Sequence, residues 1–157
     1  MRVTFRPMKK KDMTLIRKFT VETGWFSMSE MDRKELDKKE WSEHMEDVFE
    51  NFAKQENSEI LIAEDDNKSF VGYLFVGESK NMMTGKSSGF IYDIFVKEEL
   101  RGKGIGKQLI AKAENYCRER RLTKLSLMVS AHNQPALKLY ASTGFKKGQI
   151  LMEKEID

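Results

Sequence analysis

The 157-residue chain is poor in cysteine, proline and histidine, and it contains no long hydrophobic run. Its single cysteine, Cys117, excludes an internal disulfide framework and favours a reducing compartment, so we expect a cytoplasmic location. No apolar run approaches the roughly 20 residues of a membrane helix. Residues 1–12 lack the apolar core of a signal peptide. The two histidines and the cysteine lie far apart in the sequence, so we expect no metal site. Because no long apolar run is present, we also expect no membrane partner.

Repeats, low-complexity tracts and Pro/Gly/Ser linkers are also missing, so residues 1–157 are expected to form a single domain. The net charge of +3 is too small to indicate a nucleic-acid partner by itself. Short basic clusters occur at residues 9–11 and 118–121, but no aromatic residues are interleaved with them. We therefore expect no nucleic-acid partner.

Hydrophobic periodicity predicts an α/β domain, a mixed β-sheet flanked by helices in the order β-α-α-β-β-β-α-β-α-β. The strand at 89–96 is apolar on both faces and should be central. It should connect through a helix to a parallel strand by a right-handed crossover. The expected elements are strands at 3–8, 59–64, 70–78, 89–96, 124–129 and 151–156, with a further short one at 145–147, and helices at 12–22, 32–54, from 105 onward and at 134–142.

A glycine-rich, basic segment, RGKGIGK at residues 101–107, directly precedes the third of the long helices. Glycines allow backbone N–H groups to turn outward around an anion, and the start of a helix adds partial positive charge. The cations of the segment raise the positive potential further. This combination predicts a phosphate-binding turn.

Common nucleotide-binding motifs do not fit this segment. A Walker loop would need a glycine at Arg101 and a hydroxyl residue at Gln108. A dinucleotide fingerprint would need a glycine at Lys107 or at Leu109. The sequence therefore supports neither a nucleotide triphosphatase nor a Rossmann enzyme, and a plain glycine-rich connection remains the structural alternative.

A different pattern fits: Arg-x-x-Gly-x-Gly, formed by Arg101, Gly104 and Gly106. A second block follows with the spacing V-x3-N-x2-A-x3-Y-x3-G-F, at Val129, Asn133, Ala136, Tyr140, Gly144 and Phe145. Together these blocks resemble the GCN5-related N-acetyltransferase (GNAT) superfamily, which binds the pyrophosphate of acetyl-CoA in such a turn. The resemblance runs from about Ile60 to the C-terminus, and the first 55 residues match only in their β-α-α outline.

The resemblance implies acetyl-CoA as cosubstrate. It implies that the backbone of the central strand pairs with the pantetheine arm like an added strand. Asn133 would contact CoA, although it also suits the N-cap of the helix that follows. The implied cofactor-binding residues are Ile94, Phe95, Val96, Arg101, Gly102, Lys103, Gly104, Ile105, Gly106, Lys107, Asn133 and Tyr140.

Catalytic residues are implied at Tyr140 and Asp93. The family tyrosine lies near the CoA sulfur, and a phenol with a pKa near ~10 can protonate a thiolate without being ionised at rest. The alternative role of Tyr140 is packing in the core, because it lies on the same helix face as Leu137. Asp93 lies in an apolar strand, where a carboxylate is costly unless it has a partner. It is therefore either the base that removes the amine proton or a structural hydrogen-bond or ion-pair partner.

The acceptor side is expected from the N-terminal helices and the loop near Met82. Trp25, Phe26, Met28 and Met31 form either an adaptable pocket wall or packing between helices. Residues 30–50 hold nine acids and four bases, an excess of 9 − 4 = 5 negative charges. That excess favours a cationic acceptor, or it is a solvated helix face.

We therefore expect an acetyl-CoA-dependent N-acetyltransferase that transfers acetyl directly to a primary amine of a small molecule, a polyamine or a peptide. Cys117 lies well after the turn, so no acyl-cysteine intermediate is expected. The resemblance also allows a homodimer, because dimers are common in that superfamily. Alternatives are an acyl-CoA-binding sensor without turnover and a transferase of longer acyl groups.

Overall fold

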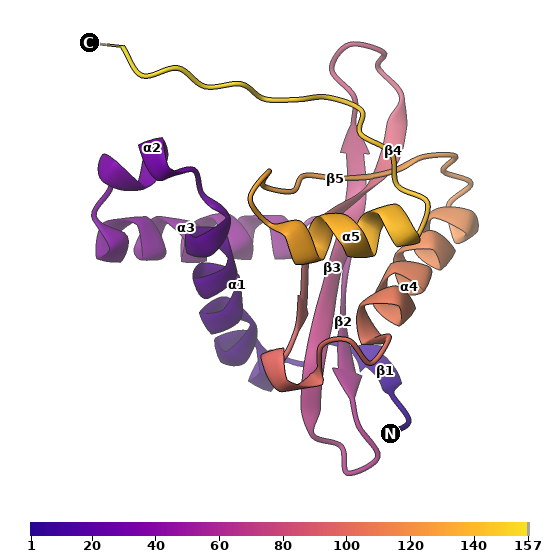
Figure 1. Cartoon of the computed structure of the whole chain (residues 1–157). Helices are drawn as coiled ribbons and strands as arrows, with labels where there is room; N and C mark the ends of the chain where they lie inside the picture. Colours follow the sequence, from indigo (N-terminus) through magenta and orange to yellow (C-terminus); the bar gives the residue numbers. More distant parts are fainter. Residues whose placement is uncertain (157) are drawn as a thin grey trace.

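A computed structural model describes residues 1–156, which fold around one five-stranded sheet in the order β1-β2-β3-β4-β5 (Figure 1). Strands β1 to β4 are antiparallel, and β4 pairs with β5 in parallel. The mixed sheet is confirmed, but the apolar strand β4 is not its central strand: β3 is central, and β4 lies next to the edge strand β5. The strands are β1 (Thr4–Pro7), β2 (Ser58–Glu64), β3 (Phe70–Lys80), β4 (Ser87–Val96) and β5 (Leu125–Leu127).

Helices cover both faces of the sheet: α1 and α3 lie on one face and α4 on the other, as Figure 1 shows. The start and buried stripe of α4 and the whole of α5 agree with the periodicity of the sequence. The helices are α1 (Met13–Ser27), α2 (Glu30–Lys34), α3 (Lys38–Ala53), α4 (Ile105–Glu119) and α5 (Gln134–Ser142), with 3-10 turns η1 (Lys10–Asp12) and η2 (Glu98–Leu100).

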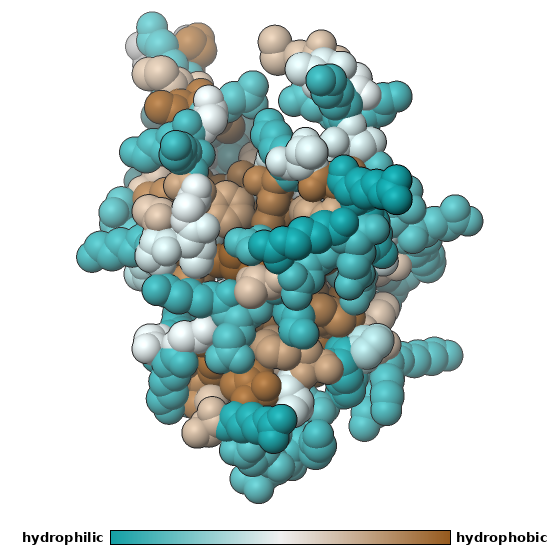
Figure 2. All heavy atoms as spheres, turned by 90° about the vertical axis from the view of Figure 1, so that its right-hand side faces the viewer, coloured by the Kyte–Doolittle hydropathy of each residue, from teal (hydrophilic) through white to brown (hydrophobic). Residues whose placement is uncertain are grey.

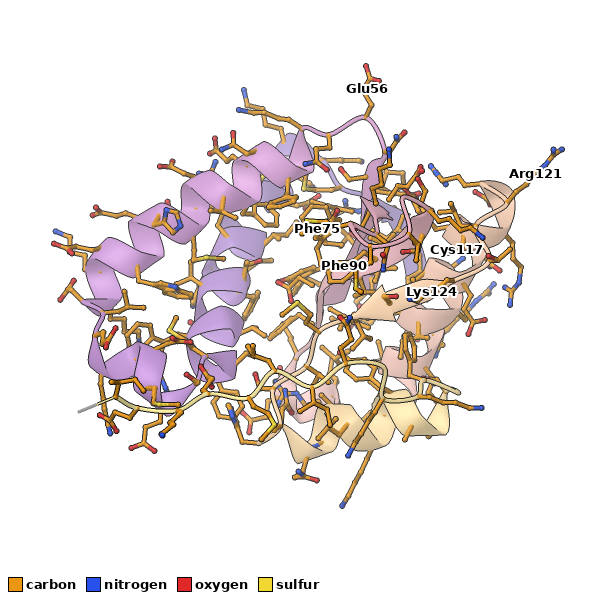
Figure 3. All side chains as sticks on the ribbon, turned by 90° about the horizontal axis from the view of Figure 1, so that it is seen from above. Glu56, Phe75, Phe90, Cys117, Arg121 and Lys124 are labelled. Atoms are coloured by element: carbon orange, nitrogen blue, oxygen red, sulfur yellow. The ribbon has the colours of Figure 1, made fainter. Side chains whose placement is uncertain are left out.

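Two apolar layers hold these helices to the sheet. The layer under α1 and α3 is aromatic, and in Figure 3 Phe75 and Phe90 lie between the sheet and these helices. The layer under α4 is aliphatic and includes Cys117, which packs against Gly89 at the start of β4. Burial raises the pKa of the Cys117 thiol, so the residue behaves as part of the core.

Helix α1 is longer than the sequence predicts. The expected end near residue 22 is wrong, because the helix continues through Gly24 to Ser27. A Cβ at Gly24 would come within 3.0 Å of the Trp41 ring of α3. The glycine therefore allows α1 and α3 to approach closely, although in sequence it resembles a helix breaker.

The expected long helix at 32–54 is also wrong, since the chain forms α2 and α3 with a break between them. Asp37 causes the break: its carboxylate accepts hydrogen bonds from the backbone N–H groups of Lys39 at 2.9 Å and Glu40 at 3.0 Å. This is an N-cap at the start of α3. Asp37 therefore begins a helix instead of lying within one.

The strands expected at 145–147 and 151–156 are not formed. The segment after α5 is extended and crosses the top of the molecule towards α2 (Figure 1), where Glu153 accepts a hydrogen bond from Ser29 Oγ at 3.1 Å. In Figure 2 this segment projects with hydrophobic atoms on its surface. Its exposed apolar side chains are Ile150, Leu151, Met152 and Ile156. Within residues 1–156, no helix has the length and apolar character needed to cross a membrane.

Candidate active site

A bulge in β4 determines where the side chain of Asp93 projects. On β3, Phe75 lies opposite Asp93 and Val76 lies opposite Ile91, so Tyr92 has no partner. The extra residue shifts the alternation of the strand, and both Tyr92 and Asp93 face α1 and α3. The carboxylate is thereby kept out of the aliphatic layer under α4.

Asp93 is held by hydroxyl groups. Tyr73 on β3 donates a short hydrogen bond to Asp93 Oδ2, and Thr20 on α1 donates to the same oxygen at 3.0 Å. Among residues 1–156, no basic side chain lies within 4.0 Å of the carboxylate. Burial raises the pKa of Asp93, while the hydrogen bonds from Tyr73 and Thr20 oppose that shift. The sequence left open whether a structural role of Asp93 would be a hydrogen bond or an ion pair. Within residues 1–156, the carboxylate is hydrogen-bonded and forms no ion pair.

The sheet opens next to Asp93. Strand β5 pairs only with Gly89–Ile91 of β4, so beyond the bulge no strand of the described chain pairs with this edge of β4. Ile94, Phe95 and Val96, the residues expected to pair with pantetheine, lie on this open edge. The Val96 carbonyl oxygen accepts a hydrogen bond from Arg101 Nε at 3.1 Å, which ties the glycine-rich turn to the end of the strand.

The glycine-rich turn has the conformation that an anion site needs. Gly102 and Gly104 have φ angles of +77° and +79°, and a Cβ on either would meet no atom within 4 Å. Gly104 is the N-cap of α4, and no side chain caps that helix. Gly106 differs, because a Cβ placed on it would lie only 2.8 Å from Leu139 Cδ2 of α5. The glycine thus makes room for the Leu139 side chain. Open backbone at an uncapped helix start fits a pyrophosphate.

Helix α5 places Tyr140 in the same region, since Leu139 packs on Gly106 at the start of α4. Tyr140 is half-buried, with the ring of Phe145 at 5.7 Å between centroids. Burial, and then the charge of Asp93, raise the pKa of Tyr140 to about 12. The phenol therefore keeps its proton at neutral pH.

The segment between β5 and α5 is fixed from both ends. Asn133 caps α5, its Oδ1 accepting from the Ala136 N–H at 3.2 Å, which confirms the capping role. Ser130 Oγ donates to the Ser27 carbonyl, and His132 Nε2 lies 2.9 Å from the Phe26 carbonyl oxygen. These contacts to the end of α1 could not be predicted from the sequence.

Two clefts lie on the α1 side. One, of about 300 Å³, runs between α1 and the end of β4, and the other, of about 280 Å³, lies where α1, α2 and α3 meet. Both combine apolar walls with carboxylates. The first is lined by Phe19, Glu22, Phe95, Lys97, Glu98, Glu99 and Arg101 and the second by Met28, Asp32, Glu35, Leu36 and Trp41.

The aromatic cluster at the end of α1 is divided between packing and cleft. Trp25 packs against Trp41, with ring centroids 5.4 Å apart, and the Lys38 ammonium lies 5.7 Å from the Trp25 ring. Trp25 thus packs between α1 and α3, which is the second of the two roles that the sequence left open for this cluster. Met28 lines the second cleft, so it could serve as a pocket wall.

The sequence alone did not identify Tyr73 and Thr20 as partners of Asp93. Thr20 lies on the face of α1 that meets the sheet, where its hydroxyl reaches Asp93. Tyr73 lies in the apolar first part of β3, residues 70–76, where a tyrosine resembles any other core aromatic. Only the register of β3 against β4, with its bulge, brings the two side chains to Asp93.

A comparison with protein families shows which family the chain belongs to. The model of the acetyltransferase (GNAT) family matches residues 25–145, which include the open edge of β4, the glycine-rich turn and α5. The chain belongs to this family.

Relatives agree with the assignment. The uncharacterized N-acetyltransferase YycN of Bacillus subtilis is 39% identical over 89 residues, 57% of this chain and 56% of that protein. The match thus spans little more than half the length of this curated relative. Its solved structure has a TM-score of 0.78 and 25% identity, covering 99% of each chain.

Other GNAT structures share the fold. A Pyrococcus furiosus protein described as an acetyl transferase has a TM-score of 0.82 and 27% identity, covering 99% of this chain and 100% of that one. AAC(6')-Iy, solved with a bisubstrate analog of CoA and acetylneamine, has a TM-score of 0.70 at 17% identity over the whole of both chains. At that identity the likeness extends to the fold only.

Proposed function

We propose that this GNAT-family chain is an acetyl-CoA-dependent N-acetyltransferase that transfers acetyl directly to a primary amine. The observation that carries the proposal is the open, left-handed glycine pair at the uncapped start of α4, beside an unpaired edge of β4. A phosphate-bearing ligand with an extended, amide-containing arm suits both features.

The same geometry supports a division of roles among the cofactor residues. Backbone N–H groups of residues 102–107 would bind the pyrophosphate, with Arg101, Lys103 and Lys107 as exposed cations nearby. The edge at 94–96 would bind the pantetheine arm. Asn133 would act mainly by capping α5 and so by holding Tyr140 in position.

Acetyl-CoA, when bound, supplies an activated acetyl group as a thioester. Asp93 would accept the proton that the attacking amine must lose, directly or through a water molecule. Tyr140 is protonated at neutral pH, and it would donate that proton to the departing sulfur as a general acid and recover one from solvent. Cys117 takes no part, because its thiol is buried against Gly89 in the layer under α4.

A cationic acceptor fits the α1 side best. The second cleft has Asp32 and Glu35 beside apolar side chains and no cation in its lining, which suits an amine with a second positive charge and a short hydrocarbon stem. A polyamine or a basic peptide terminus has this chemistry.

The test is an amine panel in which release of free thiol from acetyl-CoA is followed, with mass spectrometry of the acceptor. We expect turnover with diamines or basic peptides and little with anionic amines. Binding of acetyl-CoA without turnover on any amine would overturn the proposal in favour of a sensor module. Faster turnover of longer acyl-CoA thioesters would identify a different acyl group.

A homodimer is part of the proposal. The outer edge of β5 has no partner strand within the described chain, and Met128 at its end is 80% exposed, as are the apolar side chains of the C-terminal segment. A second copy would cover these surfaces. Light scattering should give twice the monomer mass, and deletion of residues 148–157 should give a monomer. The buried Cys117 supports a cytoplasmic location, which cell fractionation tests.

A further inference from the structure

The hydroxyl groups around Asp93 form a closed triangle. Thr20 Oγ1 lies 2.9 Å from the Tyr73 hydroxyl, and each of them donates to Asp93 Oδ2. Both donors therefore converge on one carboxylate oxygen. The other, Oδ1, accepts no hydrogen bond from a side chain of residues 1–156, while the backbone N–H of Ile94 also favours the charged carboxylate.

This asymmetry separates two jobs within one carboxyl group. Oδ2 is occupied by two hydroxyl donors that favour the charged form, and Oδ1 receives no side-chain donor from the described residues and so keeps acceptor capacity for a proton. A purely structural group at this place would not need to be an acid, because an amide oxygen accepts the same two hydrogen bonds without the cost of a buried charge. The arrangement suits a base.

We propose that Tyr73 and Thr20 are positioning residues that orient Asp93 so that Oδ1 takes the proton of the acceptor amine. The inference rests on the proposed function. In the step, the amine nitrogen forms a bond to the acetyl carbon and loses a proton to Oδ1. The carbon–sulfur bond breaks, the sulfur leaves with the electron pair, and Asp93 later returns the proton to solvent.

The surroundings of Asp93 allow a clean test. Tyr92, its neighbour on β4, also faces α1 and α3, but its hydroxyl donates to the Glu78 carbonyl at 3.3 Å instead. Tyr92→Phe is therefore a matched control for Tyr73→Phe. The groups facing Asp93 are Thr20 from α1, Tyr73 from β3 and Tyr140 from α5, with Glu22 of α1 in the adjoining cleft.

The experiment measures kcat against pH for the parent, Tyr73→Phe, Thr20→Val and Thr20→Ser. Removing a donor that favours the carboxylate raises its pKa, so the acidic limb of the profile should move to higher pH. We expect kcat at neutral pH to fall about tenfold in Tyr73→Phe, the size of one hydrogen bond to a charged group. The loss in Thr20→Val should be smaller, and Thr20→Ser should restore the parent profile. Tyr92→Phe should leave the limb in place.

A second measurement does not depend on turnover: carbon-13 NMR titration of the Asp93 carboxyl in the same variants, with the affinity for acetyl-CoA as a check on folding. A limb that moves together with the carboxyl titration supports the inference. A carboxyl titration that moves while the limb stays overturns it, because Asp93 is then not the base. If the parent releases no thiol with any amine, the proposed function fails and the inference with it. An active parent with an unchanged limb in both Tyr73→Phe and Thr20→Val sinks the inference alone.

Discussion

The two sides of the site are built differently. On the proposed cofactor side, from β4 through α4 to α5, the features that suit a ligand are backbone ones: two glycines at positive φ, a helix start without a side-chain cap among the described residues, and an unpaired strand edge. On the proposed acceptor side, α1, α2 and α3 present side chains around the second cleft. Backbone recognition restricts residue type through conformation, so it leaves a sequence motif. Recognition by side chains on a helix surface leaves only a bias of charge, which is why the ligand on one side is easier to propose than on the other.

The largest effect is expected at the boundary of the two sides. Asp93→Asn should lower turnover at neutral pH by about 10²- to 10⁴-fold, the range of a general base, and lose less at pH 9, where the amine deprotonates more readily. Stopped assays of thiol release across pH would measure this. A uniform loss at every pH would assign Asp93 a structural role instead.

The stability of the same variant separates chemistry from folding. The pKa of Asp93 is raised in the fold above its ordinary value of 3.8, so the unfolded chain releases that proton more readily. The contribution of the carboxyl to folding is therefore fully present below about that pH and is lost as the pH rises through the folded pKa. Asparagine does not titrate. Urea denaturation should show the parent losing stability relative to Asp93→Asn as the pH rises to neutral.

Tyr140→Phe should lower kcat by about 10²-fold while the affinity for acetyl-CoA changes little, because only the hydroxyl is removed. Tyr116→Phe is the control, since its hydroxyl donates to the Asn57 carbonyl, on the α4 side of the sheet. Calorimetry and steady-state kinetics give both numbers. Equal rates for the parent and Tyr140→Phe would leave the residue a packing role beside Phe145.

Gly104→Val tests the backbone of the cofactor side by itself. A β-branched residue is strained at a φ of +79°, so we expect the turn to shift and acetyl-CoA to bind at least about tenfold more weakly. Gly85→Val is the matched control, because Gly85 has a φ of +67°, equally open surroundings and a place in the distant turn between β3 and β4. Calorimetric titration of both variants should show weakened binding only for Gly104→Val.

The smallest effect is expected on the acceptor side. Neutralising Asp32 and Glu35 together should raise the KM for a dicationic amine by up to about fivefold, as for exposed ion pairs, and the difference should shrink in salt. Neutralising Glu43 and Glu46, exposed acids of α3 outside the cleft, is the control. Equal effects of the two pairs would mean that the acidic surface acts by general attraction and that neither pair contacts the acceptor.

The sequence predicts the cofactor side well because its signals are local. The buried stripe of α4 and the cap of α5 at Asn133 depend on residues a few positions apart. The errors arise where a distant neighbour decides. Gly24 continues a helix because Trp41 packs on it, and the alternating residues 151–156 form no strand because none of the described strands pairs with them.

The partners of Asp93 are a further case of long-range control. Tyr73 reaches Asp93 only through the pairing of β3 with β4, and the bulge that aligns them is hidden in a strand that is apolar on both faces. The alternation of apolar and polar residues cannot reveal a shift of one residue when both faces of the strand are apolar. The site could be located from the sequence, but the hydroxyl groups around its acid could not.

The unpaired Tyr92 makes the length of β4 important for the open edge of the sheet. Pairing with β5 stops at Ile91, directly before the extra residue, because a bulge bends its strand. Deleting the Tyr92 codon in frame would leave all the remaining residues of β4 on their present faces of the sheet. It would also remove the bulge, so the strand would straighten towards β5. We expect the hydrophobic core to survive and the edge of β4 that we propose for the pantetheine arm to close. The length of β4, to within one residue, thus decides whether this edge is open.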